Sequence, residues 1–406
     1  MRLAKSRTAI DVKFSIRRTI RGCACELVLF DSIKTAFLSV TTTIMKLGYF
    51  TMPIHPPERN YTQTLKEDRE AILLADKLGF TEAYIGEHTT DICENIPSCL
   101  AFIASLAHDT KHIKLGSGTV NLPNSHPAAV AANVAMVDHL LEGRFLFGIG
   151  PGGLRSDQEV FGNIKNDRTK MFVESINHIL GIWAGKPPYD LKGDFWNIST
   201  GETMIPEVGQ GVMLKPYQQP HPPIMVTVVE PFSKGVTAAA QRGWKPISAN
   251  FLQPNWVATH FPSYEKGCDI AGLKADRQDW RVCKSIFVAD DDATAERYGK
   301  SLDGPHGFYF NNLLTKRRAR GAATIYKPDL SMPDEAVTTE FVIDTLVIAG
   351  GVNSVVNQIL KFRDVIGDFG TLLYCGHDWV DSKLARRSMQ LMAEEVMPRV
   401  NAALRA

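Results

Sequence analysis

The sequence predicts an α/β fold, a single (β/α)8 barrel with long inserted loops, and three observations carry this prediction. The 406-residue chain is 44% hydrophobic and 22% charged, which allows one large core. From Lys46 onward, short apolar runs alternate with helical patterns about eight times, as βα units around a parallel sheet do. The apolar runs lack clear polar alternation, which is typical of strands buried on both faces. Periodicity alone does not separate a barrel from a doubly wound sheet.

The first strand and the first helix are the clearest elements. Leu47–Thr51 is predicted to be a strand, and Leu65, Ile72, Ala75 and Leu78 then recur at the spacing of one helix face. Seven further apolar runs complete a set of eight strands: Ala83–Gly86, Ile113–Val120, Phe145–Ile149, Ile224–Val229, Pro246–Ala249, Val282–Val288 and Thr371–Cys375. The prediction is therefore eight strands with helices between them.

Two long regions interrupt this rhythm. Residues 186–223 are rich in proline and glycine, and residues 301–339 contain a basic cluster, Lys316, Arg317, Arg318 and Arg320. Loops of this length inside a compact domain are usually lids or subunit contacts. We interpret the basic cluster itself as a solvated face.

Residues 1–44 differ in composition from the rest, because their first half is strongly basic. A transit peptide has this composition. We favour a simpler interpretation, an N-terminal extension that is disordered or that reflects the choice of start site, followed by one barrel domain over residues 45–406.

Charge and cysteine content exclude several function classes. The formal net charge is +1 and the pI is about 7.6, so no basic field attracts nucleic acid. The seven cysteines lack the paired spacing of a zinc site, and we expect reduced thiols and no metal. No uninterrupted apolar run reaches the roughly 18 residues of a spanning helix. We expect a cytoplasmic protein.

Two acid–imidazole dipeptides stand at the ends of predicted strands. Glu87 and His88 follow one strand, and His377 and Asp378 follow the last one. Reactive groups of parallel barrels lie at the C-terminal ends of strands, and a carboxylate beside an imidazole makes a general acid/base unit. The sequence therefore offers His88, Glu87 and His377 as catalytic candidates. A structural hydrogen bond is the alternative for each pair.

Two further segments suit an anion. The turn that contains Gly150, Gly152 and Gly153 lets the backbone approach a ligand closely and exposes amide donors. Ser233 is a candidate N-cap of the next helical pattern, and Lys234 is a candidate phosphate partner at that helix N-terminus. An ordinary helix cap explains the serine equally well.

Several motifs in order resemble the bacterial luciferase-like flavin-dependent monooxygenases, over residues 45 to about 403. The group with the greatest similarity is that of the diketocamphane monooxygenases, type II Baeyer–Villiger enzymes. The motifs that carry this resemblance are Gly86–Thr89, Glu94–Pro97, Asn121–Pro127, Glu142–Gly153 and Gly376–Asp378.

The resemblance implies roles for individual residues. It puts His88 beside the flavin, and it puts Gly118 and Thr119 behind the isoalloxazine, where the family often has a cis peptide. It implies a phosphate site between residues 150–153 and 233–234. Pro151 stands where luciferases carry an arginine, so Lys234 or another base must meet the phosphate charge. Thr89 replaces a second histidine, which argues against light emission.

The resemblance implies the oxygenase component of a two-component monooxygenase. Such a protein uses reduced FMN and O₂ to oxygenate a small organic substrate, here a cyclic ketone or a heterocycle, by Baeyer–Villiger reaction, hydroxylation or ring-opening oxygenation. Apart from the glycine turn at 148–153, the chain has no separate Rossmann fingerprint with GxGxxG and a later acid that would bind a nicotinamide, so we expect a separate NAD(P)H–flavin reductase as partner, and also a homodimer. The alternatives are a deazaflavin-dependent oxidoreductase and a non-catalytic FMN-binding protein on the same barrel.

Overall fold

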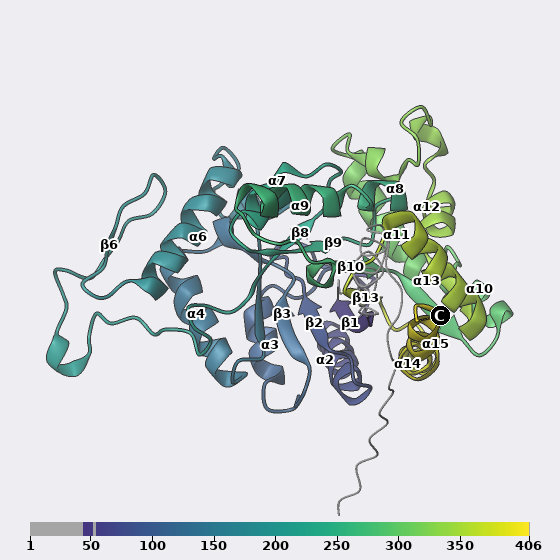
Figure 1. Ribbon diagram of the computed structural model, residues 1–406, viewed down its shortest axis with the longest axis horizontal. Helices are drawn as coiled ribbons and strands as arrows, with labels where there is room; N and C mark the ends of the chain where they lie inside the picture. The colour runs from purple at the N-terminus through teal and green to yellow at the C-terminus, as the bar shows by residue number, and fades with distance from the viewer. Residues whose placement is uncertain (1–43, 52–53, 406) are drawn as a thin grey trace, which may run out of the picture. The chain divides into compact units, whose positions relative to one another are not determined.

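The computed structural model describes residues 44–51 and 54–405, and a closed parallel barrel lies at their centre (Figure 1). The hydrogen-bonded order is β3-β2-β1-β13-β10-β9-β8-β5, and pairing of β3 with β5 closes the sheet. Closure distinguishes the barrel from a doubly wound sheet, so the predicted fold is confirmed. The barrel strands are β1 (Lys46–Thr51), β2 (Glu82–Ile85), β3 (Lys114–Ser117), β5 (Phe145–Gly150), β8 (Ile224–Val228), β9 (Lys245–Ser248), β10 (Arg281–Lys284) and β13 (Thr371–Gly376).

Side chains from nearly every strand fill the barrel interior, as close packing of a small barrel requires. The ring of Tyr84 lies where β3 has Gly116, and a Cβ at that glycine would be 2.6 Å from the ring. The interior cluster consists of Phe50, Tyr84, Leu146, Met225, Ile247, Cys283, Leu373 and Cys375. A larger apolar layer packs between the strands and the surrounding helices.

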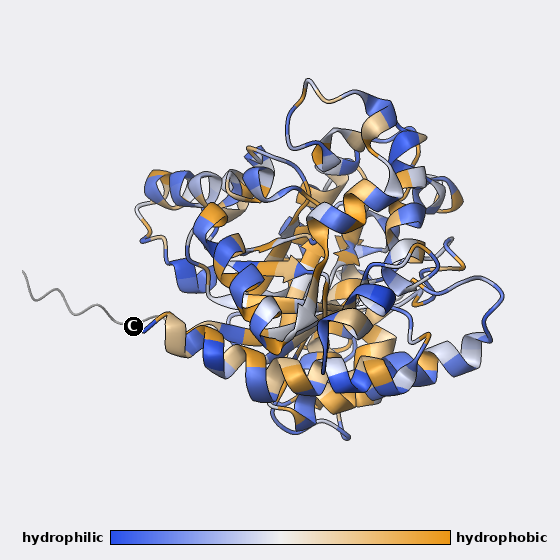
Figure 2. Ribbon diagram, turned by 90° about the vertical axis from the view of Figure 1, so that its right-hand side faces the viewer, coloured by the Kyte–Doolittle hydropathy of each residue, from blue (hydrophilic) through white to orange (hydrophobic). Residues whose placement is uncertain are grey.

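The helices cover the outside of the barrel with apolar inner and polar outer faces (Figure 2). The predicted first helix is α2 (Tyr61–Lys77), which Asn60 caps and which ends before Gly79 at φ 78°. The other helices of eight or more residues are α3 (Cys99–Leu106), α4 (Pro127–Leu140), α6 (Arg168–Ala184), α9 (His260–Ile270), α10 (Asp292–Gly299), α11 (Pro305–Arg318), α12 (Thr339–Leu346), α13 (Val352–Ile366) and α14 (Ser382–Leu391). Shorter helices are α5 (Arg155–Val160), α7 (Lys234–Ala240), α8 (Pro254–Val257) and α15 (Met397–Ala403).

Two predicted strands are each divided in the structure. The run 113–120 forms β3 and then β4 (Val120–Asn121), which pairs with β5 beyond the cis peptide Gly118–Thr119. The run 282–288 forms β10 and then β11 (Ile286–Ala289). The second half leaves the barrel and pairs with β12 (Ile348–Gly351), which the sequence analysis did not predict. Two of the four residues of β12 are glycines, which strands usually avoid.

The two long insertions have different contents. Residues 186–223 form a hairpin of β6 (Asp190–Leu191) and β7 (Ile198–Ser199), seen beside α6 in Figure 1. Residues 301–339 contain α11 and two short 3₁₀ turns, and α11 contributes to the cavity described below.

The expectation for the N-terminal extension lies outside the described residues. In the described part of the chain, Cys93, Cys99, Cys268, Cys283 and Cys375 are free thiols. No helix among these residues is both long and apolar enough to span a bilayer.

Candidate active site

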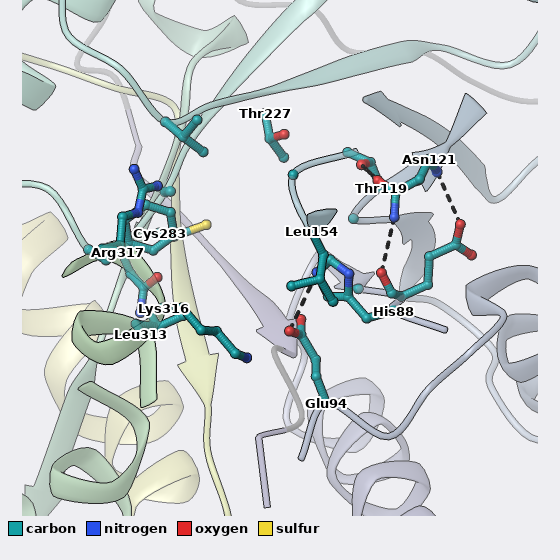
Figure 3. Close-up of a pocket in the computed structure, with 18 of the residues that line it drawn as sticks. His88, Glu94, Thr119, Asn121, Leu154, Thr227, Cys283, Leu313, Lys316 and Arg317 are labelled. Carbon is teal, nitrogen blue, oxygen red and sulfur yellow. Dashed lines mark hydrogen bonds and ion pairs between the residues drawn. The ribbon is translucent and has the colours of Figure 1, made fainter. Parts of the chain in front are cut away.

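A cavity of about 400 Å³ opens at the C-terminal ends of the barrel strands. Its walls come from the ends of β1, β8, β9 and β10, from the loops after β2, β3 and β5, and from α11 (Figure 3). Active sites of (β/α)8 enzymes lie at this end of the barrel. Among the residues predicted from sequence, the lining includes Glu87, His88, Gly118, Thr119 and Gly153.

His88 lies between two carboxylates that the sequence analysis did not assign to it. Its Nδ1 is 2.9 Å from Oδ2 of Asp157, and its Nε2 is 3.4 Å from Oε2 of Glu94. Burial alone lowers the pKa of the imidazole, but the charge of Glu94 and the hydrogen bond with Asp157 outweigh it and raise the pKa of His88 to about 9. At neutral pH the structure therefore presents a positively charged imidazolium to the cavity.

Asp157 is held in place by the loop that carries His88. Its Oδ1 accepts hydrogen bonds from the backbone N–H of Thr89 at 3.2 Å and of Thr90 at 2.9 Å, and from the Thr90 hydroxyl at 2.6 Å. Burial by itself raises the pKa of this carboxyl, but the bonds with His88 and Thr90 outweigh it and lower the pKa below the ordinary value. Asp157 therefore stays ionised and fixes the orientation of the imidazole.

Glu94 is the second acid of the cavity wall. It is 4% exposed, and burial raises the pKa of its carboxyl although the charges of His88 and Lys316 oppose this. His88 is its ion-pair partner among the described residues. The pair can share a proton at the cavity surface. In the sequence, Glu94 stands out only as part of a motif, because residue spacing alone does not show that this loop returns to His88.

The two acid–imidazole dipeptides do not pair internally, which corrects that expectation. Neighbouring residues at a strand end point in different directions. Glu87 accepts hydrogen bonds from the backbone N–H groups of Cys99 and Asn121, each at 3.0 Å, so its carboxylate ties two loops together at the cavity. Burial raises the pKa of Glu87, and these bonds oppose the shift.

His377 lies behind the cavity wall rather than on it. Its Nε2 is 3.0 Å from the hydroxyl of Ser285, which accepts a hydrogen bond from Asn250 at 2.9 Å, and Asn250 lines the cavity. Burial and then the neighbouring His306 hold the pKa of His377 well below its usual value. Its sequence neighbour Asp378 instead contacts Nδ1 of His55 at 2.5 Å. His377 is connected to the cavity through Ser285 and Asn250, and its ring also packs against Tyr309, whose hydroxyl donates to Asn250.

Glycines shape the floor and one end of the cavity. The peptide Gly118–Thr119 is cis, as the resemblance implied. A Cβ at Gly150 would lie 2.6 Å from the hydroxyl oxygen of Thr119, so this position accepts only glycine while Thr119 stays in place. Gly152 has φ +74°, a conformation that favours glycine, whereas a Cβ at Gly153 would meet no atom within 4 Å. Gly153 therefore leaves open space for a ligand.

Two arginines, not Lys234, approach the glycine turn. Arg168 donates to the carbonyl of Gly152 at 2.7 Å, and Arg320 donates to that of Gly153 at 2.6 Å. Ser233 caps α7 through the N–H of Val236 at 3.3 Å, as the simpler interpretation expected. Neither Ser233 nor Lys234 is among the lining residues of the described cavity.

The basic cluster of the second insertion is not merely a solvated face, which corrects a second expectation. Lys316 and Arg317 line the cavity from the last turn of α11, and Arg320 lines it from the turn that follows the helix. Only Arg318 points elsewhere, to the carbonyl of Val337. The helical spacing of Leu313, Lys316 and Arg317 was the signal that could have found this face.

A closed barrel with buried titratable groups at its C-terminal mouth defines this protein as a (β/α)8-barrel enzyme. Residues 45–368 match the family model described as luciferase-like monooxygenase, and the chain belongs to that family. The expected family and the expectation of a monooxygenase are thus confirmed.

Individual relatives cover nearly the whole barrel. The chain is 28% identical to 3,6-diketocamphane 1,6-monooxygenase of Pseudomonas putida, over 88% of this chain and 98% of that protein. It is 27% identical to limonene 1,2-monooxygenase of Rhodococcus erythropolis, over 87% and 86%. A solved structure of the oxygenating constituent of 3,6-diketocamphane monooxygenase from Pseudomonas putida, in complex with FMN, matches with a TM-score of 0.79 over 88% of this chain and 99% of that one.

Proposed function

We propose that this protein is the oxygenase component of a two-component flavin-dependent monooxygenase, which uses reduced FMN and O₂ to oxygenate a small organic substrate. The observation that carries the proposal is one cavity that combines an imidazolium with an arginine-flanked glycine turn. The solved relative with FMN supports the choice of cofactor.

The residues present fit FMN. Arg168 and Arg320 approach the turn 152–153 without a carboxylate partner in the described part of the chain, and Gly153 leaves room beside them. This arrangement suits a phosphate, which arginine binds through several N–H groups. The cis peptide Gly118–Thr119 and the ring of Phe50 offer a surface for the flat ring system. We therefore assign phosphate binding to Arg168 and Arg320, and no longer to Lys234.

Bound reduced FMN supplies the two electrons that activate O₂ for transfer of one oxygen atom. The protein's own contribution is electrostatic and steric. The imidazolium of His88 stabilises negative charge that develops on oxygen and holds a proton that it can donate, with Glu94 sharing that proton. Glu87 and His377 act indirectly, by positioning the loops and Asn250. Apolar lining residues such as Ile247 and Phe251 exclude water.

The proposal includes a separate reductase that supplies the reduced FMN. A relative from Acinetobacter baylyi, 26% identical, is named the oxygenase component of a flavin-dependent trigonelline monooxygenase. The proposed substrates are cyclic ketones or heterocycles, in line with the names of the relatives. The free thiols of the described residues favour a reducing compartment, and we propose the cytoplasm.

We also propose a homodimer formed through α4. Val130, Val134 and Val137 of this helix are buried, and on its outer side Met136 is 49% and Leu140 36% exposed, beside the exposed Asn133 and His139. A surface helix normally turns a polar face to solvent. A second copy of the same face would cover these side chains.

A deazaflavin cofactor is the rival, because a putative coenzyme F420-dependent oxidoreductase of Mycobacterium tuberculosis is 27% identical over 62% of this chain. We would titrate the protein with FMN and with F420, and then mix each reduced complex with O₂ and a panel of cyclic ketones and heterocycles. The proposal expects tight FMN binding and an oxygenated product. Product formation from F420 without O₂ would establish the rival, and FMN binding without any product would indicate a non-catalytic flavin carrier.

A further inference from the structure

One face of α11 carries more positive charge than a flavin phosphate needs. Leu313, Lys316 and Arg317 line the cavity at the i, i+3 and i+4 spacing of one face of α11, and Arg320 lines it from the turn that follows the helix. Lys316 forms an ion pair with Asp91, whereas Arg317 and Arg320 have no carboxylate partner among the described residues. The cavity wall thus contains Arg317 on α11, Arg320 in the turn after it and Arg168 at the start of α6, and none of the three forms an ion pair with a carboxylate of the described residues.

Arg317 differs from the other two arginines in its surroundings. Arg168 and Arg320 are hydrogen-bonded to the glycine turn, which marks the proposed phosphate end. The guanidinium of Arg317 instead lies 5.0 Å from the ring centre of Phe251, after β9. Figure 3 shows Arg317 near Cys283 and Leu313, on the side of the cavity away from His88 and Thr119. Arg317 therefore faces a different part of the cavity.

No hydrogen-bond acceptor satisfies this guanidinium within residues 44–51 and 54–405. Most of the Arg317 side chain is removed from water, and burial lowers the pKa of the guanidinium. Arg317 is half-buried at the cavity wall, and partial withdrawal of an unpaired cation from water is unfavourable, so an anionic ligand at this position would be stabilising. Glu230 lines the same cavity and attracts this guanidinium, but no ion pair joins the two among the described residues, so a bound ligand can supply a closer negative charge.

We propose that Arg317 binds a carboxylate of the substrate, so that this enzyme oxygenates a small, mainly apolar carboxylic acid. This inference rests on the proposed function and narrows it. In the proposed function, Arg168 and Arg320 bind the phosphate of FMN. The anion that Arg317 binds must therefore belong to the other molecule in the cavity, the organic substrate. A guanidinium holds a carboxylate with two parallel hydrogen bonds. Phe50, Ile247 and Leu313 offer apolar surface to the carbon skeleton.

The test measures binding of defined probes to the FMN-loaded protein. Cyclohexanecarboxylate and benzoate serve as anionic probes, and their carboxamides serve as neutral probes of the same shape. Binding is followed by calorimetry and by the perturbation of the flavin absorbance spectrum. The variants are Arg317→Gln, Arg317→Lys and, as a matched control on the other side of the same helix, Arg318→Gln.

We expect the wild-type protein and the Arg318→Gln variant to bind each acid more tightly than its amide. Arg317→Gln should weaken acid binding roughly 10- to 100-fold, as the loss of a charged hydrogen-bonded pair does, with FMN affinity unchanged. Arg317→Lys should recover part of that loss. Equal binding of acids and amides would overturn the inference and leave the proposed function intact. Weaker FMN binding by Arg317→Gln would also overturn it, by assigning Arg317 to the flavin. Failure of the wild-type protein to bind FMN would instead refute the proposed function.

Discussion

At the residue scale, the protonation of His88 is the property on which the proposed chemistry depends. Asp157 and Glu94 keep this imidazole charged at pH values where a free histidine, with a pKa near 6.5, is neutral. Removing the hydrogen bond with Asp157 should lower the pKa of His88 from about 9 toward the ordinary value, and the charged form should then be lost at lower pH.

We therefore predict that Asp157→Asn shifts the alkaline limb of the pH–activity profile downward by one unit or more, because each unit corresponds to about 1.4 kcal/mol of interaction. The exposed Glu159→Gln, on the same helix, is the control. The profile of product formed per O₂ consumed is the measurement, together with NMR titration of the His88 ring. An unchanged profile in the Asp157→Asn variant would show that His88 does not act as an acid.

A second residue-scale prediction concerns the glycine turn. Gly152→Val is a poor test of ligand contact, because φ is +74° there and a β-branched residue would strain the turn. Gly153→Val has no such strain, and its side chain would occupy the open space beside Arg320. It should weaken FMN binding about tenfold or more, equivalent to at least 1.4 kcal/mol, without lowering the melting temperature. Gly201→Val, in the hairpin insertion, is the matched control. Equal FMN affinity of all three proteins would remove the phosphate from this turn.

Whether a site residue could be predicted from the sequence depended on whether its role is visible in its local sequence or requires contact with a residue elsewhere in the chain. His88 and Gly153 were found because each lies just after a predicted strand, whereas Gly118 and Thr119 were assigned from the resemblance to the luciferase-like monooxygenases. The contacts of Asp157 and Glu94 with His88 were not predicted. These residues lie 69 and 6 positions after His88, and no local sequence pattern shows that the intervening loops bring them back to it. The role of Lys234 was predicted from a helix N-terminus, but the exposed lysine is not part of the described cavity lining.

At the element scale, a buried histidine joins three segments on the outer side of the site. His55, after β1, lies 2.5 Å from Asp378 after β13 and 3.2 Å from Asp68 on α2. Burial lowers the pKa of His55, but the two carboxylates outweigh it and raise the pKa to about 9. A folded-state pKa above 6.5 means that the protonated ring adds stability below pH 6.5, and that this stability is lost as pH rises through 9.

We predict that the melting temperature of the wild-type protein falls between pH 6.5 and about 9.5, with His55 contributing on the order of 3 kcal/mol at neutral pH or below. His88 titrates in the same window and contributes to the same decline. His55→Gln should be less stable at pH 6 and should lose much of this pH dependence, whereas the exposed His112→Gln should keep it. Thermal melts across this range provide the measurement. A His55→Gln variant with the wild-type slope would contradict the arrangement.

Element prediction succeeded where hydrophobic runs were long and failed where glycine interrupted them. All eight barrel strands were predicted within a few residues, because strands buried on both faces leave an unbroken apolar run. β12, with the sequence Ile-Ala-Gly-Gly, has no such run, and its pairing with β11 is a tertiary effect. The contribution of α11 to the cavity wall was not predicted either. Charged side chains on a helix normally indicate a face exposed to solvent, and the sequence does not show that a cavity lies beside this helix.

At the scale of the whole molecule, the proposed homodimer rests on the exposed Met136 and Leu140 on the outer side of α4. Met136→Glu places a charge in that face and should shift the protein from dimer to monomer, because burying an unpaired carboxylate is unfavourable. Sedimentation equilibrium at several concentrations measures the change, and Val365→Glu, at an exposed position of α13, is the control. A wild-type protein that is monomeric at all concentrations would contradict the proposal, as would a Met136→Glu protein that stays dimeric.

The central claim is that the barrel transfers one atom of O₂ to an organic substrate with electrons from reduced FMN. The most direct measurement is a single turnover of the enzyme with reduced FMN under ¹⁸O₂, with cyclic ketones and small carboxylic acids as substrates and mass spectrometry of the products. We predict one ¹⁸O atom in each product molecule from ¹⁸O₂ and none from H₂¹⁸O. Oxygen in the product that comes from water, or a product that forms equally well without O₂, would contradict the claim.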